Sequence, residues 1–403
     1  MYNANVVKIQ YSESNQIVLF KALLFVAFPL LSVIWALVDL RHRSSYCILF
    51  VYGLFIGYNL TINESAGFDS LRYVEVFDTI QLTFFIDFAD WITYSSSIKD
   101  FYLHTLSYIV SSYTSDYHFL FLSASIVFSF LCLNCLRILT EQFEYKNTFI
   151  CFCIVFLFFI SNSIININGF RFWTATWYVL WCTFNIILFE RKKFLFLLVF
   201  APFFHSSMWA YILIILIYYL SRNHIKSWLI IASISFFISS LAIIILQNIG
   251  GYLPEVFQRL INNYADNEYI ASRNSGTGWT WLENLFKIAQ LIYTLIVLLL
   301  IGQNNRLRKL NQNQRYLFVF TLCLYSFSNF TSSIPSFGSR FVTMVFPLLA
   351  YFLIKFSQDI QFRKLIILIP LVWSFTSLYI FTLLYLQLLP SDFFYSNLFF
   401  LLF

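Results

Sequence analysis

Long apolar runs separated by short polar stretches make up most of the chain. A helix crosses a bilayer with about 20 mostly apolar residues. On that basis the pattern predicts spans near 18–39, 45–61, 117–136, 147–163, 172–189, 227–247, 281–301, 316–333, 340–356 and 365–388. It therefore predicts an all-α polytopic integral membrane protein of about 10–12 transmembrane helices, with residues 1–403 as a single transmembrane domain.

The apolar stretch 194–220 is interrupted in its middle by a polar segment that contains His205. This stretch is either one kinked helix or two half-helices that dip into the membrane and return to the same side. A broken helix with a polar tip is tolerated at membrane depth only where it lines a protein cavity or a water-filled cleft.

The charge distribution favours the hairpin, because short basic loops prefer the cytoplasm. With a hairpin at 194–220, the cytoplasmic segments hold 16 of the 25 Lys and Arg residues and five of the 19 Asp and Glu residues. A single crossing would instead turn the basic cluster Arg306 to Arg315 outward. We therefore predict the hairpin, an outer amino terminus, and extracytoplasmic loops near 62–116 and 248–280. The stretch Ile98 to Ser112 is predicted to lie as a helix in the outer interface.

Composition excludes several classes of protein. Only 11% of the residues are charged, whereas an ordinary soluble domain carries roughly 25%, so a soluble enzyme or a nucleic-acid binder is excluded. All seven cysteines fall in apolar runs, and the pair Cys132 and Cys135 is predicted to be core rather than a redox or metal site. No carboxylates or histidines cluster with metal-ligand spacing, so no metal or other cofactor is expected.

Five arginines are predicted on the outer side, and an ionisable group at the membrane boundary is a functional hypothesis by default. Guanidinium groups clamp phosphates through two parallel hydrogen bonds, which lysine cannot imitate. The cluster therefore predicts a phosphorylated substrate at the outer leaflet, and a lipid-linked pyrophosphate fits that description. The arginines are Arg72, Arg171, Arg259, Arg273 and Arg340.

Each of these polar residues also has a structural interpretation. An arginine at the end of a span commonly extends to the lipid headgroups. His205 could satisfy the backbone groups freed by the helix break, and Asp69 could cap a loop helix. Tyr73 could be a packing or interfacial residue.

Four motifs in a fixed order carry a resemblance to a known family. They are Gly67-x-Asp69-x-x-x-Tyr73, Asn168-Gly169-Phe170-Arg171-Phe172-Trp173-Thr174-Ala175, Phe204-His205-Ser206-Ser207 and Ser339-Arg340. Together with the length and span pattern, roughly from Val18 to Leu388, this set resembles the EpsG family of bacterial exopolysaccharide and O-antigen polymerases of the Wzy kind. The family commonly places Gln directly after its arginine, where this chain has Phe172. The resemblance implies a GT-C-like helical fold whose active cleft faces the periplasm.

The chemistry implied by the resemblance is glycosyl transfer in the bacterial cytoplasmic (inner) membrane. An undecaprenyl-pyrophosphate-linked glycan is the donor, and a lipid-linked repeat unit supplies the acceptor hydroxyl. Metal-independent catalysis is expected, and the resemblance leaves open whether a chain-length regulator takes part. The bilayer is the other partner, and no nucleic acid is expected.

Residues of the motifs take roles in this scheme. Arg171 and Arg340 are expected to hold the pyrophosphate, assisted by Arg72 or Arg273, and Tyr73 joins the substrate-binding set. His205 is the first candidate for the proton acceptor and Asp69 the second. Two other functions remain open: a flippase for the lipid-linked glycan, and another glycosyltransferase or ligase that uses the same lipid donor.

Overall fold

The computed structural model describes residues 13–63, 68–82, 101–141, 148–239, 280–334 and 337–395, together with positions 244, 245, 248, 252, 258, 397 and 398. Every regular element within these residues is helical, which confirms the all-α polytopic class. Arg273 and most of the loop near 248–280 lie outside the described residues.

The helices of the first half of the chain are α1 (Asn15–Ala27), α2 (Pro29–Val38), α3 (Arg43–Tyr58), α4 (Asp69–Leu82), α6 (Phe101–Ser111), α7 (His118–Thr140), α8 (Thr148–Ser161), the 3₁₀ helix η3 (Ile164–Gly169) and α9 (Phe170–Ile187). The second half contributes α10 (Lys193–Leu198), α11 (Ala201–Phe204), α12 (Met208–Ser221), α13 (Ile225–Ser235), α17 (Thr280–Ile301), α18 (Asn304–Leu307), α19 (Gln312–Phe330), α20 (Gly338–Lys355), α21 (Ile360–Val372), α22 (Ser374–Tyr379), the π-helix η5 (Ile380–Tyr385) and α23 (Leu386–Leu388).

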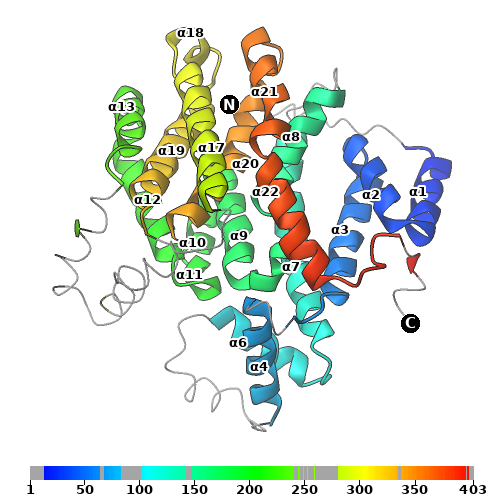
Figure 1. Cartoon of the computed structure of the whole chain (residues 1–403). Helices are drawn as coiled ribbons and strands as arrows, with labels where there is room; N and C mark the ends of the chain where they lie inside the picture. The colour runs from blue at the N-terminus through cyan, green and yellow to red at the C-terminus, as the bar shows by residue number, and fades with distance from the viewer. Residues whose placement is uncertain are drawn as a thin grey trace.

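Five helical segments of the described chain are long and apolar enough to cross a membrane, which makes this a multi-pass membrane protein. Five shorter apolar helices accompany them. The bundle has α18 at one end and α4 and α6 at the other (Figure 1). We call these the inner and the outer end, following the charge-based prediction.

The apolar run 18–39 differs from the predicted single span. Pro29 starts a second helix, and Phe28 before it has an extended φ of −147°, because proline disfavours the helical conformation in the preceding residue. The Lys21 Nζ atom lies 2.7 Å from both Glu13 Oε1 and Asp39 Oδ2. The run therefore folds back, and Glu13 and Asp39 lie at the same end of the helix pair, whereas a single span would place them at opposite ends.

The stretch 194–220 forms the predicted hairpin, and its first arm follows α9 in the opposite direction. Phe194 of α10 contacts Trp181, with ring centroids 4.9 Å apart, whereas His205 contacts Phe172 near the start of α9 at 5.3 Å. The first arm of the hairpin thus runs from the inner end of α9 to its outer end. His205 occupies the tip, directly after α11.

The second arm, α12, returns to the inner end. Arg222 directly follows α12, and its guanidinium carbon lies 4.8 Å from the ring centroid of Tyr316. Tyr316 lies in the second turn of α19. Asn313 of the same helix donates a 3.1 Å hydrogen bond to the carbonyl of Leu188, just before the first arm. Both ends of the hairpin therefore lie beside the beginning of α19, on one side of the bundle.

Helices α8 and α9 form another hairpin, with η3 as its turn. Phe158 stacks near Trp177 at 4.7 Å, and Asn162 Nδ2 donates to the Trp173 carbonyl at 2.9 Å. In both pairs the two residues lie at equal distances in sequence from the same point within η3, so the two helices are antiparallel. This arrangement places η3 and the first turn of α9 at the outer end.

Candidate active site

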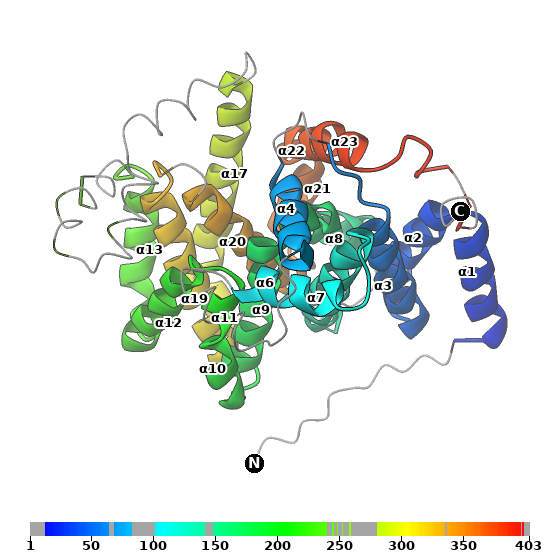
Figure 2. The same ribbon diagram turned by 90° about the horizontal axis from the view of Figure 1, so that it is seen from below.

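Four elements bring predicted site residues together at the outer end of the bundle. Arg171 lies in the first turn of α9, Arg340 in the first turn of α20, and His205 in the break between α11 and α12. Asp69 and Tyr73 lie on α4. Figure 2 views the molecule from this end, where α4, α6 and α11 lie close to the ends of α7 and α9.

Tyr73 holds the Arg171 side chain in place. The Arg171 Nε atom donates a 3.1 Å hydrogen bond to the Tyr73 hydroxyl, and the guanidinium carbon lies 5.1 Å from the centroid of the same ring. Tyr73 is only 2% exposed and packs on Phe170 at 4.7 Å. A rigid buried ring thus fixes the position of a cation from another helix.

The hydroxyl of Tyr73 remains protonated at neutral pH. Burial raises its pKa to about 12, against the opposing effect of the Arg171 charge. The oxygen accepts a hydrogen bond from Arg171, so its own proton can be donated to a bound anion. Tyr73 therefore belongs to the polar wall of the site as well as to the core.

Arg340 has an aromatic platform of its own. Its guanidinium carbon lies 5.2 Å from the ring centroid of Phe172, and the edge of Phe172 also meets the His205 ring. Among the residues that the structure describes, no carboxylate pairs with the Arg340 side chain. This half-buried arginine is therefore positioned by stacking, with its charge not neutralised by a described acid.

The hydrogen bonds of His205 assign its proton. The backbone N–H of Ser207 donates to His205 Nδ1 at 3.2 Å, and the Ser207 hydroxyl oxygen lies 2.7 Å from the same atom. Since Nδ1 is an acceptor here, the neutral ring carries its hydrogen on Nε2. Burial and the charges of Arg171 and Arg340 lower the pKa of His205 to about 3. At physiological pH the ring is therefore neutral and its Nε2–H is a donor.

Asp69 lies against the turn that precedes α9. A Cβ atom added to Gly169 would be 3.4 Å from Asp69 Oδ2 and 3.3 Å from Trp173 Cδ1. These are close contacts, so glycine at position 169 lets the carboxylate approach the turn. Asp69 is exposed at the first turn of α4 and lies close enough to Tyr73 for its charge to raise the pKa of that hydroxyl.

Two predicted residues are not brought into this group. Arg72 is exposed on α4, and within the described residues no hydrogen bond, ion pair or cation–π contact joins it to the other site residues. Arg273 lies outside the described residues. Conversely, His104 of α6 comes close to Arg171, since burial and the Arg171 charge both lower the pKa of that histidine.

Metal-ligating groups do not gather in the described part of the chain: no three His, Cys, Asp or Glu side chains lie together there. Cys132 and Cys135 are buried free thiols inside α7, as expected for core residues.

Sequence reasoning missed Phe172, Ser207 and His104. In the sequence Phe172 is only a departure from the family pattern, whereas in the structure its ring lies beneath the Arg340 guanidinium. Ser207 sets the tautomer of His205 through its backbone, which no residue pattern encodes. His104 lies within the predicted interfacial helix, and nothing in its spacing connects it to Arg171.

Comparison with known proteins gives one match. A family model described as the EpsG family matches residues 44–396, which is most of the chain. No curated protein and no solved structure matches.

Proposed function

Because the chain belongs to the EpsG family of Wzy-like polysaccharide polymerases, we propose that it joins undecaprenyl-pyrophosphate-linked repeat units at the outer face of the bacterial cytoplasmic membrane. The observation that carries this proposal is the convergence of Arg171 and Arg340, from two different helices, on one neutral imidazole at the outer end. Such a site suits a pyrophosphate leaving group at a lipid surface.

The main catalytic requirement in this reaction is charge stabilisation. The bond between the anomeric carbon and the pyrophosphate oxygen breaks, and its electron pair leaves with the pyrophosphate. Fixed cations directed at that oxygen stabilise the transition state. Arg171 and Arg340 supply the charge, and stacking on Tyr73 and Phe172 holds both guanidinium groups in place. The Tyr73 hydroxyl adds a neutral donor.

The hydrogen bonds of His205 favour Asp69 over His205 as the base. A neutral imidazole whose Nδ1 already accepts a hydrogen bond has no acceptor left for the sugar hydroxyl, so His205 serves as a donor to the pyrophosphate. Asp69 then accepts the proton of the acceptor hydroxyl as that oxygen bonds to the anomeric carbon. The proton thus goes to a carboxylate, and the negative charge goes to the arginines.

The placement of charge also favours an enzyme over a flippase. A flippase needs polar groups along a path that opens to both sides. Two buried cations toward the inner side, Lys21 and Arg306, are paired with acids. The stacked Arg340, which no described acid neutralises, lies instead at the outer end. This distribution supports chemistry at one surface.

Complementation of a deletion strain tests the proposal, with polymer length read as a ladder on a gel. His205→Ala should abolish long polymer. His205→Gln should retain a measurable fraction, because its amide can donate near the Nε2 position although it cannot act as a base. Arg72→Ala is the matched control and should give a normal ladder.

Three results would contradict parts of this account. Equal polymer from wild type and His205→Ala would exclude the site. Equally inactive Gln and Ala variants would exclude the donor role of His205. Accumulation of lipid-linked units inside the deletion strain would indicate a flippase.

A further inference from the structure

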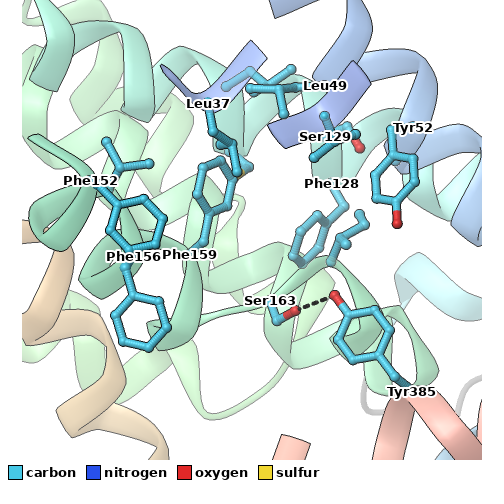
Figure 3. Close-up of a pocket in the computed structure, with 16 residues that line it drawn as sticks. Leu37, Leu49, Tyr52, Phe128, Ser129, Phe152, Phe156, Phe159, Ser163 and Tyr385 are labelled. Atoms are coloured by element: carbon cyan, nitrogen blue, oxygen red, sulfur yellow. Dashed lines mark hydrogen bonds between the residues drawn. The ribbon is translucent and has the colours of Figure 1, made fainter. Parts of the chain in front are cut away.

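An apolar cavity lies inside the bundle, beside the start of η3. Its volume is about 230 Å³, and its lining comes from α2, α3, α7, α8, η3 and η5. Figure 3 shows Leu37, Leu49, Phe128, Phe152 and Phe159 around the space. Because Phe152 is 48% exposed on the surface of α8, this wall of the cavity borders the membrane.

The outer end of the cavity is polar. The hydroxyls of Ser163 and Tyr385 are 2.9 Å apart there, and the dashed line in Figure 3 marks their hydrogen bond. Tyr385 ends the π-helix Ile380–Tyr385, and short π-helical turns are frequent at functional sites. The Tyr52 side chain lines the same cavity.

The cavity and the charged site share one wall, the 3₁₀ helix η3. Ile164 at its start lines the cavity, whereas Gly169 at its end meets the Asp69 carboxylate. With a rise of about 2 Å per residue in a 3₁₀ helix, these two points are about 10 Å apart. One lipid molecule can therefore have its headgroup at Arg171 and its chain in the cavity.

Helices α3 and α7 pack closely against each other beside this cavity. Gly53 and Ser129 face each other across the two helices, and a Cβ on Gly53 would collide with the Ser129 hydroxyl. Both residues line the cavity. Small residues let the two backbones approach closely, and the apolar space lies beside their contact.

We propose that this cavity binds the first part of the polyisoprenoid chain of the lipid-linked substrate, an inference that rests on the proposed function. The lining is apolar apart from a few hydroxyls, it borders the membrane, and it ends about 10 Å along η3 from the site for the pyrophosphate.

The experiment compares two carriers in purified, reconstituted protein. Repeat units are linked through pyrophosphate to either an undecaprenyl chain or a dimethylallyl chain, which is too short to reach the cavity. Leu133→Trp and Val155→Phe fill the cavity from α7 and α8. Leu299→Trp on α17, where the leucine is 42% exposed and lines no part of this cavity, is the matched control.

The filled variants should raise the KM for the undecaprenyl carrier at least tenfold and leave the KM for the dimethylallyl carrier unchanged, while Leu299→Trp changes neither. An unchanged preference for the long carrier in both filled variants would overturn the cavity assignment while leaving the polymerase function intact. Polymerisation of neither carrier by the wild type would instead overturn the proposed function, and the cavity assignment with it.

A photoreactive residue at position 133 provides a second measurement that does not depend on turnover. It should crosslink the undecaprenyl carrier in competition with membrane phospholipid. Crosslinking of phospholipid alone, at saturating carrier, would show that the cavity holds bulk lipid and would overturn the proposal.

Discussion

Arg306 at the inner end and Arg340 at the outer end are the same residue type in similar aromatic settings, but their partners differ. Arg306 is 5% exposed and stacks 5.0 Å from the centroid of Phe362. Its guanidinium also donates to Asp359 Oδ2 at 3.3 Å and to the Leu300 carbonyl at 3.1 Å, and two glutamines accept further bonds. Arg340 has the stacking contact without a described acid.

The difference separates a structural cation from one that is ready for a ligand. A buried charge must be paired or bonded to persist, and Arg306 meets that requirement within the protein. Arg340 is half-buried at the outer end of the bundle, where solvent can reach its charge. Stacking on an aromatic ring fixes the position of both arginine side chains. The ion pair with Asp359 leaves Arg306 less able to bind an external anion than Arg340.

Removing the outer arginine should give the largest effect on activity. Arg340→Ala should lower the rate of polymer formation by about 10²–10³-fold, as for loss of a group that stabilises transition-state charge. The amount of folded protein in the membrane should not change. The rate is measured on purified protein with lipid-linked units, and a rate within twofold of wild type would contradict the proposed role.

Removing the inner arginine should affect stability instead. Arg306→Ala leaves Asp359 and two glutamines without their donor, which should lower the free energy of unfolding by about 2 kcal/mol. Activity per folded molecule should stay close to wild type. Thermal unfolding in detergent measures the first quantity, and a large loss of specific activity would erase the distinction between the two ends.

The aromatic platforms provide a finer test of the same comparison. Phe172→Leu keeps an apolar side chain but removes the ring beneath Arg340, so activity should fall by about three- to tenfold, the size of a modest cation–π contact. Phe362→Leu beneath Arg306 should lower the melting temperature and leave kcat unchanged. Equal effects of Phe172→Leu and Phe362→Leu on kcat would contradict the assignment of Arg340 to activity and Arg306 to stability.

The smallest expected effect concerns pH. The folded protein keeps the pKa of His205 near 3, below the value of about 6.5 for a free histidine. The unfolded chain therefore binds a proton that the folded chain does not, and stability falls as the pH drops from about 6.5 toward 3. His205→Gln should weaken this dependence. Unfolding temperatures at pH 7.5 and pH 5 provide the measurement, with identical pH dependence of both proteins as the contrary result.

Much of this arrangement follows from the sequence, because charge and hydrophobicity constrain topology. The basic loops around Arg191 and Arg306 required the 194–220 stretch to return inward, and that topology alone put His205 on the side of Arg171 and Arg340. Side-chain partners do not follow in the same way. Tyr73 and Arg171 are 98 residues apart in the chain, and only packing brings them together.

The first apolar run shows a different limit. A count of apolar residues cannot distinguish a straight span from two short helices, and the single Pro29 decides between them. The ion pairs of Lys21 then stabilise the folded-back form. The restriction that Pro29 places on the backbone of Phe28 ends the first helix, although the run is long enough for a single span.

Binding of undecaprenyl pyrophosphate to purified protein tests the central claim most directly. Arg171→Ala and Arg340→Ala should each weaken binding by about 10–100-fold, the value of a hydrogen bond to a charged group, whereas Arg72→Ala should bind as wild type does. Equal affinity in all four proteins would contradict the claim that the two stacked arginines hold the pyrophosphate.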